Sequence, residues 1–247
     1  KESDSGISVT LVTESPVSYY SGMLPGTISK LYTDEDLKVH LKPLAEWCGA
    51  NYIESRVTRI SGAENKIYLE NGESVEYDVL AVNVGSKTKD TGNIKGVWEH
   101  ALTTRPINDL IPKIQKKEIE LKEKGVIPTV VVCGAGAAGT ELSFAFKKRW
   151  SEYFGQDIKV TLLAAKEEPV HTEVRQTKDL INSKLKEKGI EVKTNVHVKE
   201  VTPTGVILED GSIVPCDVAV WATGAEPQKV STESDLDLLK GFFRVNN

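Results

Sequence analysis

The chain has 247 residues and a net charge of −5, with 39% hydrophobic and 27% charged residues. These values are ordinary for a globular protein, and the length allows one large domain or two modest ones. The acidic balance argues against a nucleic-acid partner, because no basic excess exists to release the counterions around phosphates. No apolar run approaches the roughly 20 residues that a membrane-spanning helix needs, so we expect no such helix.

The first half of the chain predicts short apolar strands separated by turns. The expected strands lie at residues 9–12, 50–53, 57–60 and 78–84. The first ends at Glu14 and the last runs into Gly85. Between the last two, Asn71-Gly72 predicts a hairpin with a type I′ turn, because both residues tolerate positive φ. Residues 20–26 contain two glycines and a proline, which favours a shaped loop over a helix.

The middle of the chain predicts a linker followed by a helix. Residues 88–108 include Gly92, Gly96 and Pro106 and are expected to connect two domains. A helix is predicted from about residue 109 to 124, where Gly125 stops it.

The second half repeats the order of the first. Its predicted strands lie at residues 129–133, 160–163, 190–192, 198–201 and 217–223. A hairpin turns at Asp210-Gly211, the last strand runs into Gly224, and helices are expected at 137–153 and 173–188. Strands that alternate with helices imply a parallel sheet covered on its faces. A repeat of this kind predicts two related α/β units.

The second half also has a glycine-rich turn that the first lacks. Gly134, Gly136 and Gly139 follow a predicted strand and open a predicted helix, which is the context that makes G-x-G-x-x-G informative. The first glycine permits a tight turn, the second lets backbone approach a diphosphate, and the third allows close helix–strand packing. The sequence therefore predicts a dinucleotide site here. The equivalent turn of the first half would precede residue 1, so we expect the first unit to lack its opening.

The choice of nicotinamide nucleotide stays open. An acidic residue after the second strand favours NAD, and a basic one nearby favours NADP. Ala164 stands at the expected acidic position, and Lys166 follows it. In the first half, Glu14 does stand at the end of a strand, where it could meet a ribose or simply be exposed.

Other chemistry finds little support in the sequence. The three cysteines are widely spaced and form no C-x-x-C, which argues against a zinc site or a vicinal disulfide. Cys48 and Cys133 are both expected to be buried packing residues, which fits a reducing intracellular compartment. The four histidines lack metal-ligand spacing, and no hydrolase or Walker motif is present.

With these features the chain resembles the two-domain flavoproteins of the pyridine nucleotide-disulfide oxidoreductase superfamily. The stretch Tyr20-Ser21-Gly22-Met23-Leu24-Pro25-Gly26 is similar to one subgroup in the branch of type II NADH dehydrogenases and sulfide:quinone reductases, some members of which are fused to selenide, water dikinase. The resemblance implies an α/β fold of two Rossmann-like units, in which an NAD(P)-binding domain is inserted within an FAD-type domain that is truncated at both ends. It implies an FAD-type domain over 1–108, an NAD(P) domain over 109–226, and a return to the first over 227–247.

The resemblance also assigns roles to residues. It implies that FAD is bound by Glu14 at the adenosine ribose and by the backbone of Val57 at the adenine, with Gly85 close to the flavin diphosphate. It implies that NAD(P)H is bound by the three motif glycines Gly134, Gly136 and Gly139, with Glu141 near the nicotinamide end and Thr223 and Gly224 closing that domain. No catalytic side chain is expected, because the cofactors carry the redox chemistry.

The function implied is that of an FAD-dependent NAD(P)H oxidoreductase, which passes hydride from nicotinamide to flavin and electrons on to a quinone or similar small acceptor. One alternative is a structural or assembly subunit that retains the fold with weak or no flavin binding. Another is a reductase of sulfur or selenium species, which would need Cys48 or Cys133 to be accessible. The resemblance leaves open peripheral membrane attachment through segments outside the chain, a homodimer or a larger assembly, and a cytoplasmic or mitochondrial location.

Overall fold

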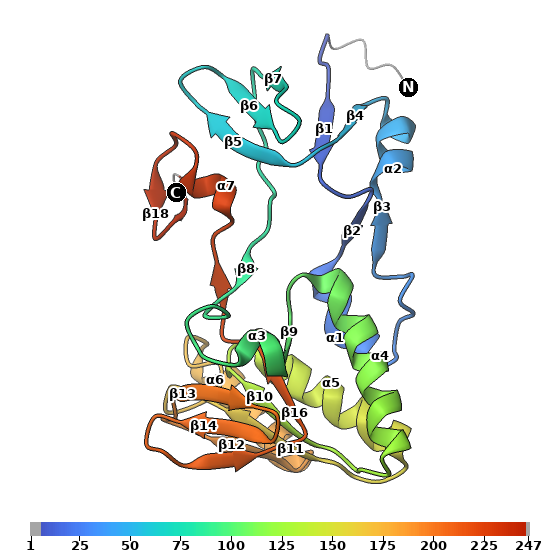
Figure 1. The fold of residues 1–247 in the computed structure, drawn as a ribbon, viewed down its shortest axis with the longest axis vertical. Coiled ribbons are helices and arrows are strands. Elements are labelled where there is room, and N and C mark those ends of the chain that lie inside the picture. Colours follow the sequence, from blue (N-terminus) through green and yellow to red (C-terminus); the bar gives the residue numbers. More distant parts are fainter. Residues whose placement is uncertain (1–5, 246–247) are drawn as a thin grey trace. The chain divides into compact units, whose positions relative to one another are not determined.

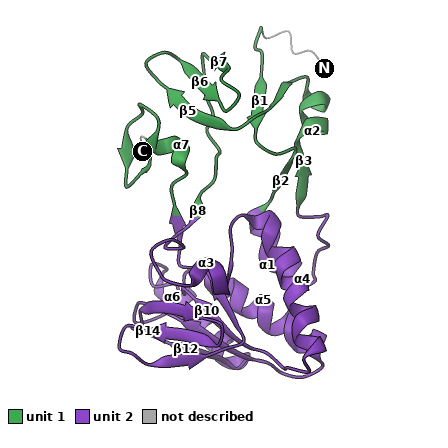
Figure 2. Cartoon of the chain, viewed as in Figure 1, with its two compact units in different colours: residues 1–20, 38–87, 226–247 green, residues 21–37, 88–225 purple. Residues whose placement is uncertain are grey.

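A computed structural model describes residues 6–245 and divides the chain into two compact units (Figure 2). Unit 1 comprises residues 1–20, 38–87 and 226–247, and unit 2 comprises residues 21–37 and 88–225. Most of unit 2 is therefore inserted into the chain of unit 1, as the sequence analysis expected. The chain passes between the units four times, after residues 20, 37, 87 and 225, and the last two crossings lie in the short strands β8 (Lys87–Thr88) and β17 (Ala225–Glu226).

Unit 2 is built on a five-stranded parallel sheet (Figure 1). In spatial order its strands are β12 (Ile190–Lys193), β11 (Lys159–Leu163), β10 (Thr129–Cys133), β16 (Val218–Trp221) and β9 (Ala101–Thr103). The central strands are almost fully buried, because both faces of a parallel sheet are covered. Their side chains alternate between the two faces.

Helices and a small sheet cover the two faces of this parallel sheet. The helices of unit 2 are α1 (Leu24–Ile28), α3 (Val97–His100), α4 (Ile107–Glu123), α5 (Ala137–Phe154) and α6 (Arg175–Glu187). Helix α5 contacts β10, β11 and β12. An antiparallel sheet of β13 (Val198–Thr202), β14 (Gly205–Leu208) and β15 (Ile213–Pro215) packs its apolar side chains against alternate residues of β10 and β16, among them Val131, Cys133 and Trp221.

Unit 1 contains several small sheets. Strands β1 (Thr10–Thr13) and β4 (Asn51–Glu54) pair in parallel, and β2 (Val17–Tyr19) pairs antiparallel with β3 (Lys38–His40). Strands β5 (Val57–Ser61), β6 (Lys66–Leu69) and β7 (Ser74–Glu76) form an antiparallel sheet. Helices α2 (Leu41–Cys48) and α7 (Lys229–Thr232) and the hairpin of β18 (Leu238–Leu239) and β19 (Phe242–Phe243) complete the unit. Its core gathers around Ile60, Ile67, Leu69 and Val230.

Both predicted hairpins form, but with a different turn. Gly72 has φ of 87° whereas Asn71 has no positive φ, so the type I′ prediction is wrong. The amide of Gly72 donates to the carbonyl of Leu69, and the amide of Leu69 donates to the carbonyl of Glu73. This is a three-residue loop with glycine in the left-handed position. The Asp210-Gly211 hairpin repeats this pattern, with the amide of Gly211 donating to Leu208.

The strand predicted at residues 78–84 does not form, although its counterpart in unit 2 does. That counterpart, β16, is held by β10 on one side and β9 on the other. Residues 78–84 have no such partner within the described residues, and the side chain of Val79 is 90% exposed. An apolar sequence alone does not make a strand without a neighbour to pair with.

Residues 21–26, which belong to the predicted loop 20–26, are helical, and this corrects the sequence prediction. A 3₁₀ turn over Ser21–Met23 leads into α1 (Leu24–Ile28). Pro25 is tolerated because it lies in the first turn of the helix, where its missing N–H is not needed. Gly26 provides close packing, since a Cβ there would lie 2.5 Å from the Tyr32 ring.

The linker predicted at residues 88–108 is structured and belongs to unit 2. It contains α3 and then β9, which completes the parallel sheet beside β16. The boundary between the compact units therefore falls at residue 87/88, whereas the sequence analysis placed it at 108/109. The assignment of a cofactor to each domain stays a prediction.

Candidate functional site

The glycine-rich turn of unit 2 lies at the carboxyl edge of the parallel sheet, between two neighbouring strand ends. The amide of Gly134 donates to the carbonyl of Leu163 at 3.0 Å, and the amide of Ala222 donates to Cys133 at 2.8 Å. Helix α5 begins directly after this turn, with Gly136 as its N-cap. The first N–H groups of a helix have no partner within it and attract anions. The turn is therefore placed to receive a diphosphate.

The three motif glycines are required for different reasons. Gly134 has φ of 106°, and a Cβ there would lie 2.5 Å from the carbonyl oxygen of Ala222. A Cβ at Gly139 would lie 1.7 Å from the carbonyl oxygen of Gly134, so this glycine permits helix–turn packing. Gly136 has an ordinary φ of −72°, and a Cβ there would meet nothing within 4 Å. Neither backbone strain nor packing against other described residues requires a glycine at position 136, which is the N-cap of α5.

The segment after β11 passes beside the same turn. The amide of Val170 donates to the carbonyl of Ala135 at 2.8 Å. Ala164, which stands where an acidic residue would favour NAD, is 1% exposed, with its amide bonded to Lys193 and its carbonyl to Val196. Lys166 is exposed and makes no ion pair in the part of the chain that the structure describes.

Lys89 holds the loop that follows β16. Its carbonyl accepts bonds from the indole of Trp221 and the hydroxyl of Thr223, at 2.8 and 3.2 Å, and its amide donates to Gly224 at 3.1 Å. Gly224 has φ of 129°, which explains the glycine at this position. Thr223 and Gly224 therefore lie in the loop against which the glycine-rich turn packs. Glu141, the other residue predicted near this site, is exposed on α5. The sequence analysis did not single out Lys89.

Unit 1 contains a cavity of about 800 Å³ at the end of β1. Glu14 and Val57, which the sequence analysis connected with the adenosine of FAD, both line it. Asn83 and Val84 line it as well, although the adjacent Gly85 does not. Gly85 has φ of 66° and open space around it, so its backbone conformation explains the glycine.

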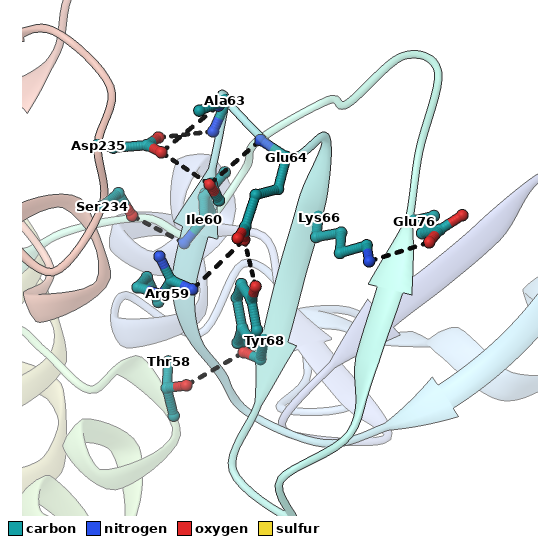
Figure 3. A network of polar contacts seen from close by, with 12 residues as sticks. Thr58, Arg59, Ile60, Ala63, Glu64, Lys66, Tyr68, Glu76, Ser234 and Asp235 are labelled. Atoms are coloured by element: carbon teal, nitrogen blue, oxygen red, sulfur yellow. Dashed lines mark hydrogen bonds and ion pairs between the residues drawn. The ribbon is translucent and has the colours of Figure 1, made fainter.

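Four cations and three carboxylates line this cavity: Arg56, Arg59, Lys87, Lys229, Glu14, Glu70 and Glu233. Arg56 forms an ion pair with Glu14 at 2.7 Å. Arg59 of β5 lies over the ring of Tyr68 of β6, 3.9 Å from its centroid, and Glu64 contacts both side chains (Figure 3). The pKa of Glu64 is lowered, chiefly by the bond from Tyr68. Of these residues, only Glu14 was singled out from the sequence.

Asp235 ties the last part of unit 1 to the β5–β6 hairpin. Its carboxylate accepts bonds from the hydroxyl of Ser61 at 2.7 Å and the amide of Gly62 at 2.6 Å. Figure 3 shows Asp235 beside this hairpin. The hydroxyl of Ser234 accepts a bond from the amide of Ile60 at 2.9 Å. The bond from Ser61, followed by that from Gly62, lowers the pKa of the Asp235 carboxyl. These contacts position α7, whose residues Lys229 and Val230 line the cavity.

The three cysteines are free, and two of them, Cys133 and Cys216, are buried. Burial raises the pKa of the Cys216 thiol to about 11 and raises that of Cys133 further. Cys48 is exposed at the end of α2, so its predicted burial is wrong. Helix α2 has eight residues and buries only Ala45, which leaves its last turn uncovered.

The residues that the structure describes contain no group of three or more His, Cys, Asp or Glu side chains that could hold a metal. None of their helices is both long and apolar enough to cross a bilayer.

The sequence model of the family described as pyridine nucleotide-disulphide oxidoreductase matches residues 2–247. The chain belongs to this family. Membership confirms the resemblance and the α/β fold expected from the sequence.

The relatives within this family include a probable NADH dehydrogenase of Dictyostelium discoideum, which is 30% identical over 204 residues. The match covers 70% of this chain and 44% of that protein. A type II NADH:quinone oxidoreductase of Haemophilus influenzae is 26% identical over 189 residues, which cover 65% of this chain and 42% of that protein. The chain thus spans less than half the length of these two relatives.

Two solved structures illustrate the shared fold. NDH2 from Plasmodium falciparum in complex with NADH has a TM-score of 0.77 at 20% identity, covering 92% of this chain and 52% of that one. The sulfide:quinone oxidoreductase of Aquifex aeolicus has a TM-score of 0.74 at 22% identity, covering 92% of this chain and 55% of that one. At these identities the two structures show the shared fold. The name of the Haemophilus influenzae relative matches the branch of type II NADH dehydrogenases that the sequence predicted.

Proposed function

We propose that the protein of which this chain is part is an FAD-dependent NAD(P)H oxidoreductase that delivers electrons to a quinone or similar small acceptor. The curated relatives support this proposal, since their names describe NADH dehydrogenases and NAD(P)H:quinone oxidoreductases. They also support an intracellular location, because several of them are mitochondrial.

Gly136 is the single observation that carries the nucleotide part of the proposal. No positive φ and no close packing requires a glycine there, although glycine is a favourable N-cap residue, and a Cβ at this position would meet nothing within 4 Å at the N-terminus of an 18-residue helix. A dinucleotide diphosphate fits both facts. The cavity of unit 1 supports the flavin part, because it brings Glu14 and Val57 together at the end of a parallel strand.

Each unit has a defined role in this proposal. In unit 2, Gly134, Gly136 and Gly139 bind the nicotinamide dinucleotide through its diphosphate, and Thr223 and Gly224 border the same edge of the sheet. In unit 1, the carboxylate of Glu14 accepts hydrogen bonds from the ribose hydroxyls of the FAD adenosine. The backbone of Val57 contacts the adenine, and Gly85 lies close to the flavin diphosphate. When bound, the two cofactors supply hydride transfer and electron delivery to the acceptor. The chain supplies binding and orientation, and no side chain acts as a general base.

An absorbance spectrum of the full-length protein tests this proposal. We expect a flavin band that is bleached under anaerobic conditions by NADH or NADPH and restored by a soluble quinone. The nucleotide that bleaches it faster decides the choice left open by Ala164 and Lys166. A colourless protein that takes up no FAD on reconstitution would refute the proposal and favour a structural subunit that retains the fold.

A further inference from the structure

Glu14 and Arg56 are brought together by the pairing of two parallel strands. Strand β1 pairs with β4, with Thr13 opposite Glu54, so both strands end at the same edge. The amide of Ser55 donates to the carbonyl of Thr13 at 2.8 Å, which fixes this register one residue beyond the strands. The residues that follow, Glu14 after β1 and Arg56 after β4, therefore lie side by side on the wall of the unit 1 cavity.

The two side chains meet through one atom each. The Nε of Arg56 donates to the Oε2 of Glu14 at 2.7 Å. The second carboxylate oxygen of Glu14, Oε1, makes no hydrogen bond or ion pair in the part of the chain that the structure describes. The side chain of Arg56 is 61% exposed and that of Glu14 is 60% exposed, so the pair lies at the open side of the cavity. One carboxylate oxygen is thus held by Arg56 while the other stays available.

An exposed glutamate without a partner samples several rotamers, and a ligand that uses only one of them must order the side chain on binding. A single bond from Arg56 reduces that cost without occupying both oxygens. We propose that Arg56 is a positioning residue, which fixes the carboxylate of Glu14 so that its free oxygen meets the ribose hydroxyls of the FAD adenosine. This inference rests on the proposed function, because it takes FAD as the ligand of unit 1.

The structure also defines the rival role. The two Nη groups of Arg56 make no hydrogen bond or ion pair within the described residues, so they could bind the ligand directly. A direct contact would act independently of Glu14, whereas positioning acts only through Glu14. A double-mutant cycle separates the two.

The test is FAD binding by the apo form of the full-length protein, measured by flavin fluorescence. Arg56→Gln is expected to raise the Kd for FAD about three- to tenfold, and Glu14→Gln about 10- to 100-fold, as the loss of a hydrogen bond to a charged group implies. The double variant Glu14→Gln/Arg56→Gln should match Glu14→Gln alone. Arg56→Lys, which keeps a cationic donor, should recover part of the loss.

Two ligand probes give a readout that a merely structural change would not produce. FMN lacks the adenosine, so its weak binding should be unchanged in Arg56→Gln. FAD prepared with 2′-deoxyadenosine should bind to the wild type more weakly than FAD does. The ratio of these two Kd values should be smaller in Arg56→Gln than in the wild type. Lys66→Gln is the matched control, because it removes an ion pair of 3.1 Å from the same unit at a residue that does not line the cavity.

The outcomes separate this inference from the proposed function. Arg56 does not position Glu14 if the Arg56→Gln variant binds FAD as tightly as the wild type does. The same conclusion follows if Arg56→Gln raises the Kd for FAD by the same factor in the Glu14→Gln background as in the wild type. If Glu14→Gln binds FAD as tightly as the wild type, or the wild type binds no FAD, the flavin site assigned to unit 1 is itself wrong. Thermal unfolding of each variant identifies any loss that comes from misfolding.

Discussion

Arg149 of α5 and Glu118 of α4 form a buried ion pair inside unit 2. Both residues are nearly inaccessible, at 2% and 4% exposed. The Nε and Nη2 atoms of Arg149 donate to the two carboxylate oxygens, and its Nη1 donates to the carbonyl of Ile28 in α1. The indole of Trp150 also donates to Glu118 at 2.8 Å. One guanidinium thus joins α1, α4 and α5.

This pair predicts a large effect on stability. Arg149→Met should lower the free energy of unfolding by about 3–5 kcal/mol, because it leaves a buried carboxylate without its cation. The double variant Glu118→Leu/Arg149→Met should cost less than the sum of the single variants, since it removes both charges. Urea unfolding followed by circular dichroism measures both.

The exposed pair Lys148–Glu152 on the same helix is the control for Arg149. Lys148→Met should cost no more than about 1 kcal/mol, because solvent screens exposed ion pairs. A similar cost for Arg149→Met and Lys148→Met would contradict the role given to the buried pair.

The cysteines predict one fast-reacting thiol. Cys48 is exposed, whereas Cys133 and Cys216 are buried with raised thiol pKa values, so neither forms thiolate at neutral pH. A thiol reagent such as DTNB should therefore modify one cysteine of the native protein quickly and all three after unfolding. Cys48→Ser should abolish the fast phase. A fast phase that survives in Cys48→Ser would show that one of the other thiols is accessible.

The sequence predicted the parts of the fold whose partners lie within the chain. Helix α5 and strand β11 appear almost where expected, because the helix begins and ends at glycines and the strand is a short apolar run that is buried in the sheet. The same reasoning failed for residues 78–84, where the apolar pattern is as strong but no neighbouring strand is present among the described residues. A single strand's pattern does not contain information about its partner.

The candidate site was predicted only where local sequence carries the signal. The glycine-rich turn of unit 2 could be predicted from the spacing of its glycines together with the predicted strand before it and helix after it, since strand, turn and helix are all local in the sequence. Arg56 could not, because its place beside Glu14 depends on the pairing of β1 with β4, more than 40 positions apart in the chain. The buried pair of Arg149 and Glu118 was hidden for the same reason, since both lie in charged stretches typical of solvated helix faces.

Asp235 predicts a pH dependence of stability. Hydrogen bonds in the folded state lower the pKa of its carboxyl, so its contribution is present above the unfolded pKa of about 3.9 and is lost as the pH falls through the lower folded value. Asp235→Asn should lower stability at neutral pH and flatten the acid side of the stability curve below pH 4. Asp237→Asn is the control, because it removes the same charge from the same segment without these bonds. Equal acid sensitivity of Asp235→Asn and the wild type would rule out this role.

Gly136 and Gly139 predict opposite consequences of adding one methyl group. Gly136→Ala should leave stability within about 1 kcal/mol of the wild type, which is the scale of a change at a helix N-cap. Its methyl group would enter the space in front of the helix, so the Kd for NADH and NADPH should rise at least about tenfold, equivalent to 1.4 kcal/mol. Gly139→Ala should instead prevent unit 2 from folding normally, because its Cβ would overlap the carbonyl oxygen of Gly134.

Gly92→Ala is the matched control for this pair. Gly92 also lies in unit 2, has no positive φ and has nothing within 4 Å of an added Cβ, so its substitution should change neither stability nor nucleotide binding. Thermal unfolding and titration with NADH and NADPH distinguish the three variants. Tight nucleotide binding by Gly136→Ala would mean that no ligand comes close to this glycine. That result would remove the main structural support for a dinucleotide site at the start of α5.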